Sequence, residues 1–90
     1  MNLIPEQREL FRHALLAVLE RDGSAVFGLS AATLAELVKP RGFRPVVAEV
    51  EAELAYLQDK DLVTTIAKTL SPEVKAWRIT AAGRDFLAAT

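Results

Sequence analysis

The sequence predicts one small domain over residues 1–90, of the α+β class: mainly α-helical, with a small antiparallel β-hairpin. Three observations lead to this prediction. Apolar residues recur at helical spacing as far as Asp59, and the stretch after Leu62 alternates and is rich in β-branched residues. Near the end of the chain, Thr80 followed by AAGRDFLAA indicates a short capped helix. No linker or internal repeat divides the chain, so we expect one core.

The first helix is predicted over residues 5–21. Pro5 suits the first helical position and Glu6 the first turn. An apolar stripe follows, made of Phe11, Ala14, Leu15 and Val18. Three further leucines widen it: Leu10, Leu16 and Leu19. This width fits either a well-buried helix or a helix that also presents a partner surface.

Two more helices are predicted in the middle of the chain. Residues 22–24 break the first helix, and the short apolar run 25–28 is read as one strand. LSAATLAELV is the second helix, with Ser30 as its N-cap and its end set by Pro40. The third helix is predicted to start near Pro45. Its buried face is expected to contain Val47, Val50, Leu54 and Leu57.

The last third of the chain predicts the hairpin and the final helix. LVTTIAK reads as a strand, TLSPE as a turn or loop, and VKAWRIT as the returning strand. Thr80 is expected to cap a helix that buries Phe86 and Leu87. One shared core is expected to contain Leu54, Leu57, Ile66, Trp77 and Ile79.

Three segments carry a resemblance to a known fold. LSAATLAELV resembles the first helix of a helix-turn-helix unit, VEAELAYLQDKDLV resembles the pattern L-x-x-L-x-x-x-G-L-V, and WRITAAGRDFL resembles Y-R-L-T-x-x-G-R-x-x-L. From about residue 10 onward the chain resembles the winged helix-turn-helix domains of MarR-type and PadR-type bacterial regulators. A fainter likeness is to small winged-helix proteins of Mu-like prophages. The resemblance implies the order α-(β)-α-α-β-β-α, DNA binding and a homodimer.

The chain departs from this family pattern at Asp61, which stands where the family usually has Gly. Asp tolerates the left-handed conformation better than most residues, so we expect the turn to form at a small cost.

Composition argues against an enzyme. The chain has no Cys and a single His, His13, which lies off the apolar stripe. Its four Gly form no phosphate-binding motif. We therefore expect no catalytic site, no cofactor and no metal site. Acidic residues appear too early for a signal peptide and no apolar run is long enough to span a membrane, so a cytoplasmic protein is expected.

The DNA-binding interpretation has to place its cations outside the third helix. The net charge is −1, and between Pro45 and Asp59 there are three Glu but no Lys or Arg. The nucleic-acid contacts are therefore predicted before that helix and in or near the wing, at Lys39, Arg41, Arg44, Lys68, Lys75 and Arg78. These contacts should be mainly to phosphates.

Two smaller interpretations concern the start of the third helix. No residue there can act as an N-cap, so its N–H groups are open either to a phosphate or to water. Glu49 could accept a hydrogen bond from a cytosine amino group.

A protein-interaction module is the alternative function. The outward face of the third helix is small and apolar with one aromatic residue, and Glu53 adds to its acidic edge. The residues of this docking surface are Ala48, Glu49, Ala52 and Tyr56. A homodimer through the first and last helices is compatible with either function.

Overall fold

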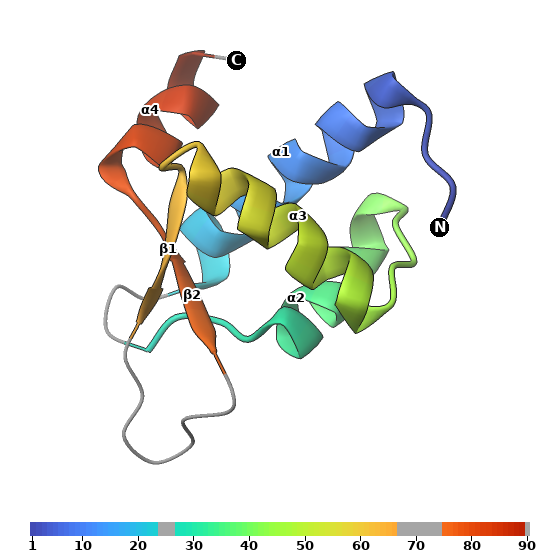
Figure 1. The fold of residues 1–90 in the computed structure, drawn as a ribbon, viewed down its shortest axis with the longest axis horizontal. Helices are drawn as coiled ribbons and strands as arrows, with labels where there is room; N and C mark the ends of the chain where they lie inside the picture. Colours follow the sequence, from blue (N-terminus) through green and yellow to red (C-terminus); the bar gives the residue numbers. More distant parts are fainter. Residues whose placement is uncertain (24–26, 67–74, 90) are drawn as a thin grey trace.

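The computed structural model describes residues 1–23, 27–66 and 75–89. Its elements are the helices α1 (Pro5–Asp22) and α2 (Ala31–Leu37), the short 3-10 helix η1 (Lys39–Arg41), α3 (Val47–Asp59), the strands β1 (Val63–Ile66) and β2 (Ala76–Ile79), and α4 (Ala81–Ala89). Figure 1 shows α3 lying across α1, with the hairpin and α4 at the C-terminal end of α3. The predicted α+β class and element order are confirmed.

In the strand predicted over residues 25–28, only residues 27 and 28 are described, and neither lies in a strand. The nearest strand-like pairing is one bridge between Leu29 and Trp77. Gly28 makes this bridge possible, because its φ is 64° and a Cβ there would lie 2.6 Å from the Trp77 carbonyl oxygen. Residues 24–26 lie outside the described residues.

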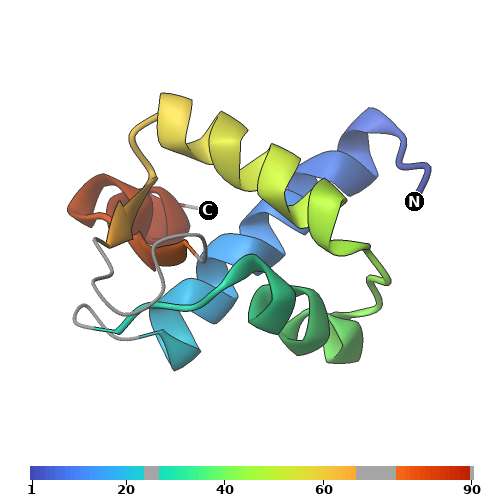
Figure 2. The same cartoon turned by 60° about the horizontal axis from the view of Figure 1, so that its bottom comes forward.

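The core is centred on α1, which α2, β2 and α4 all contact (Figure 2). Leu16 and Leu19 are fully buried with the predicted stripe, so most of the wide apolar face of α1 is used within the chain. Leu10 is the exception, at 63% exposed. Burying so many large apolar side chains supplies the main favourable term for folding.

Strand β1 pairs with β2 in antiparallel register, from Val63 opposite Ile79 to Ile66 opposite Ala76. Trp77 and Ile79 are buried in the core with Leu54 and Leu57, as predicted. The placement of Ile66 in this core is wrong, because Ile66 is only partly buried, at the end of β1. Its Cδ1 lies beside Gly28.

The junction of α3, β1 and α4 explains two of the sequence motifs. Asp61 has a φ of 63°, so it takes the left-handed conformation expected of it. Thr80 Oγ1 donates to the Asp61 carbonyl at 2.7 Å and accepts from the Gly83 N–H at 3.0 Å. Gly83 is buried, and a Cβ there would come within 2.2 Å of the Leu62 carbonyl oxygen. Only Gly fits this position without movement of the backbone.

Helix α3 begins at Val47, close to the predicted start near Pro45, which is buried in the preceding turn. Two predictions about individual residues are wrong. Val47 is 41% exposed and belongs to the outer surface. Phe86 is also exposed, because α4 turns it towards solvent while Leu87 packs against the core.

Candidate nucleic-acid interface

The solvent-facing side of α3 is a strip of small residues. Val50, Leu54 and Leu57 are buried beneath the helix, and the opposite side exposes Ala48, Ala52 and Ala55. We call these three alanines the outward strip. Helical spacing gave this assignment correctly. Because these side chains are short, a partner surface can approach the α3 backbone closely.

Glu53 does not lie on an exposed acidic edge, and that prediction is wrong. It is only 7% exposed, and it accepts hydrogen bonds from Arg12 Nε at 2.8 Å and Arg8 Nη1 at 3.0 Å. Arg12 also bonds Glu9 at 2.9 Å. Burial alone would lower the pKa of Arg12, but the hydrogen bond and charge of Glu53 outweigh it and raise that pKa. This cluster joins α1 to α3.

Two residues of the predicted docking surface are engaged by the chain itself. The guanidinium carbon of Arg12 lies 3.8 Å from the centroid of the Tyr56 ring, and the ammonium of Lys60 lies 5.7 Å from it. Glu49 accepts from the Val46 N–H at 2.9 Å and contacts the Met1 amino group at 2.7 Å. The Met1 amino group and the Val46 N–H both lower the pKa of Glu49.

Glu49 also changes the interpretation of the start of α3. Val46 offers no capping side chain, but the Glu49 carboxylate reaches back to its N–H, as the third residue of a helix often does. The carboxylate thereby occupies the positive end of α3. The Val46 N–H is therefore bonded within the chain and is not left for a phosphate or for water. Both oxygens of Glu49 are likewise engaged within the chain, which argues against its proposed contact with a cytosine amino group.

The turn before α3 presents the predicted cations at the surface. Lys39 is paired with Glu36 at 2.6 Å, and Arg44 donates to the Lys39 carbonyl at 3.1 Å. Arg41 is exposed beside Gly42, whose φ of 95° turns the chain towards α3. Arg41 and Arg44 are therefore both exposed in the segment that leads into α3.

The hairpin places one of its predicted cations near α3. Lys75 is exposed and lines a pocket with the first two turns of α3. Arg78 is half-buried on the face of β2 opposite Trp77 and Ile79, because side chains alternate along a strand. Lys68 lies outside the described residues.

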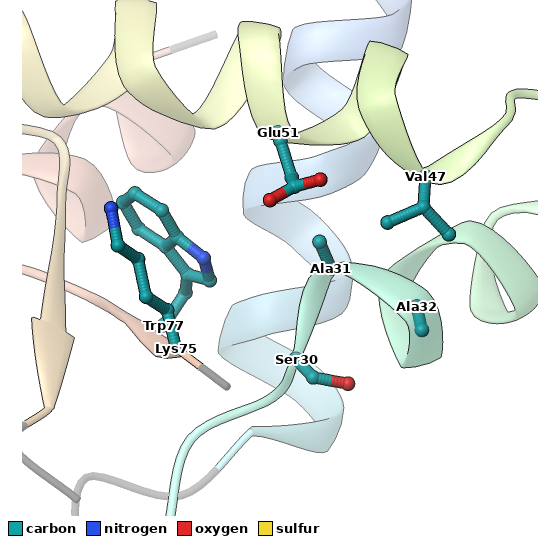
Figure 3. Close-up of a pocket in the computed structure, with 7 residues that line it drawn as sticks. All are labelled: Ser30, Ala31, Ala32, Val47, Glu51, Lys75 and Trp77. Atoms are coloured by element: carbon teal, nitrogen blue, oxygen red, sulfur yellow. The ribbon is translucent and has the colours of Figure 1, made fainter. Parts of the chain in front are cut away.

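The pocket between α2, α3 and β2 brings in a residue that the sequence interpretation missed. Its volume is about 220 Å³, and it is lined by Ser30, Ala31, Ala32, Val47, Glu51, Lys75 and Trp77. Figure 3 shows the Glu51 carboxylate directed into it from α3, opposite Trp77 and Lys75. No sequence signal marked this residue, because Val47, one helical turn before Glu51, was assigned to the buried face.

A second groove lies between α1 and α4, lined by Glu6, Glu9, Leu10, His13 and Phe86. His13 is partly buried in it. In the part of the chain that the structure describes, no group of three His, Cys, Asp or Glu is placed to hold a metal ion. Within the same residues, no helix is long and apolar enough to cross a membrane.

Comparison with known proteins gives structural likeness alone. No protein-family model and no curated protein sequence matches the chain. Among solved structures, an S. aureus MepR mutant bound to an oligodeoxyribonucleotide superimposes with a TM-score of 0.75 at 19% identity. A PadR family transcription regulator from Clostridium difficile gives 0.69 at 17% identity, covering 88% of this chain and 80% of its own.

The chain has the winged-helix fold. Helices α2 and α3 are its helix-turn-helix pair, and the β1–β2 hairpin is its wing. A Lactococcus lactis ZitR mutant shows the same winged-helix arrangement, with a TM-score of 0.69 at 23% identity. Each of the MepR and ZitR matches covers 93% of this chain, which spans 57% of MepR and 56% of ZitR. None of these three structures supports the prophage likeness.

Proposed function

We propose that this winged-helix chain is a DNA-binding transcription regulator that works in the cytoplasm. The observation that carries the proposal is the exposed outward strip of α3, which Arg41 and Arg44 precede in the chain. Lys75 of the wing lines a pocket with Val47 and Glu51 of the same helix. A structure of the same fold, the MepR mutant, is bound to an oligodeoxyribonucleotide. In the winged-helix arrangement the corresponding helix enters the major groove.

Affinity for DNA should come from the edges of this surface. The outward strip itself holds no cation, so phosphate contacts fall to Lys39, Arg41, Arg44, Lys75 and Arg78, together with Lys68 beyond the described residues. Each phosphate contact releases counterions and lowers the logarithm of the binding constant by about 0.9 per logarithmic unit of salt. Binding is therefore salt-sensitive and only moderately strong.

Duplex binding measured by fluorescence anisotropy across a salt series tests this proposal. The Arg41→Gln/Arg44→Gln double variant should weaken binding to every sequence and lower the salt slope by about two units. Arg84→Gln is the matched control, because Arg84 is exposed on α4, near the opposite end of α3. Absence of binding at roughly tens of micromolar protein in low salt, or a double variant equal to the control, would refute the proposal.

The protein-interaction alternative relied on an acidic edge beside the docking surface. Glu49 and Glu53 do not provide that edge, because both are engaged within the chain. One variant still separates the two functions. Ala52→Arg adds a cation to the outward strip, so it should strengthen DNA binding and change stability by less than about 0.5 kcal/mol. A docking surface would instead be blocked by the long side chain.

The exposed Leu10 and Phe86 at the α1–α4 groove are the proposed contact of a homodimer. Exposed apolar side chains that share one groove favour association with another apolar surface. Sedimentation of the wild type against Leu10→Glu tests this. The variant should be monomeric at concentrations where the wild type is dimeric, and equal sedimentation of the two proteins would exclude this contact.

A further inference from the structure

The Glu51 carboxylate differs from the other two acidic side chains in the first half of α3. Glu49 caps its own helix and Glu53 is buried against two arginines. Glu51 is exposed and is directed into the pocket between α2 and the wing (Figure 3). Within the described ranges it has neither a hydrogen bond nor an ion pair, and Lys75 on the opposite wall has no ion pair either. The carboxylate is thus open to a ligand.

We infer that Glu51 is the base-reading residue of this winged helix and that it accepts a hydrogen bond from the exocyclic amino group of a cytosine in the major groove. The inference rests on the proposed function. An ionised carboxylate only accepts hydrogen bonds. Cytosine presents an amino donor in the major groove, whereas guanine presents two acceptors and thymine presents one. Adenine presents a donor next to an acceptor, so it is the second choice.

The surroundings of Glu51 suit this contact. Val47 lies one turn earlier on the same side of α3 and is exposed, so its methyl groups can meet the methyl of a neighbouring thymine. Ala48 and Ala52 beside them are too short to hold the helix away from the groove floor. Lys75 lines the same pocket, and its positive charge offsets the repulsion between the carboxylate and nearby phosphates.

A readout by a carboxylate explains how a helix without cations can serve a DNA-binding fold. The phosphate contacts at Arg41 and Arg44 are the same for every sequence. A base that presents only acceptors repels the Glu51 carboxylate and offers it no hydrogen bond. Discrimination therefore arises mostly from rejection of wrong bases.

Selection from a randomised duplex library tests the inference. The wild type should enrich cytosine at one position, by about fivefold or more over guanine or thymine. In Glu51→Gln the amide pairs best with adenine, so the preference at that position should change from cytosine to adenine. Asp59→Asn is the matched control, since Asp59 is an exposed acid at the far end of the same helix. This control should keep the wild-type preference.

The outcomes separate the inference from the function on which it rests. A wild type that binds DNA without a cytosine preference, or a Glu51→Gln variant that keeps that preference, would overturn the role of Glu51 and leave the DNA-binding proposal standing. A wild type that binds no duplex would overturn both. Because Glu51 is exposed, Glu51→Gln should unfold at the wild-type temperature, so a changed preference reports on the contact and not on folding.

Discussion

Replacement of Arg12 by Met tests whether the charged cluster under α3 holds that helix on α1. Arg12→Met removes the 2.8 Å hydrogen bond to Glu53 and the contact with Tyr56 but keeps most of the apolar stem. Side-chain exposure is 8% for Glu53, 17% for Arg12 and 48% for Arg8. The variant therefore leaves a buried carboxylate with one half-exposed partner.

The size of this effect follows from the burial of the partners. Loss of a buried carboxylate's only partner costs about 3–5 kcal/mol, and a hydrogen bond to a charged group contributes about 1.5–3 kcal/mol. Because Arg8 remains, we expect Arg12→Met to cost about 2–3 kcal/mol. That corresponds to a Tm lower by roughly 8–24 °C for a domain of this size. The double variant Arg12→Met/Glu53→Leu should be more stable than the sum of the two single changes predicts.

Urea and thermal unfolding followed by circular dichroism at neutral pH measure these free energies. Arg21→Met is the control, because Arg21 is exposed in the last turn of α1 and its loss should change stability by less than about 0.5 kcal/mol. A variant Arg12→Met as stable as the control would show that the Arg12–Glu53 contact does not hold α3 on α1. Single effects that simply add in the double variant would show the same.

Three further predictions concern single positions. Gly83→Ala should lower the free energy of unfolding in urea by roughly 1–3 kcal/mol, because the new Cβ meets the Leu62 carbonyl. The same exchange at an exposed helical position is stabilising. Asp61→Gly should raise stability by about 0.5–1 kcal/mol, since it relieves the left-handed conformation; equal or lower stability would contradict this. The pKa of Glu49 is lowered in the folded protein, so the ionised carboxylate stabilises the fold at pH values above its ordinary pKa of 4.5. This stabilisation is lost as the pH falls through the lowered pKa. The Tm difference between wild type and Glu49→Gln should therefore shrink on acidification.

The fold was predictable because it depends on local patterns. Helical spacing placed Val50 and Leu54 correctly, alternation placed Trp77, and turn chemistry placed Asp61 and Thr80. These signals lie within a few residues of the feature they specify.

The candidate site was predictable only in part, because its decisive contacts are distant in sequence. Arg8 and Arg12 meet Glu53 across separations of 45 and 41 residues, and nothing local marks that pairing. Glu49 was different, since a Glu at the third position of a helix is a known capping residue. The predicted start was only near Pro45, and without the start at Val47 the third position of the helix could not be identified. Val47 was assigned to the core by its helical spacing from Val50, and Glu51 was left without a role.

The outward strip has a consequence for how such a protein changes over time. Ala48, Ala52 and Ala55 contribute no side chain to the core. Under the proposed DNA-binding function, a substitution there therefore alters what the helix recognises and leaves folding almost untouched. Selection can therefore act on specificity without a compensating repair of stability. A duplicated copy of this chain could acquire a new operator by a few changes along one helix. For the same reason, the three alanines are the natural positions for a combinatorial library directed at a chosen DNA sequence.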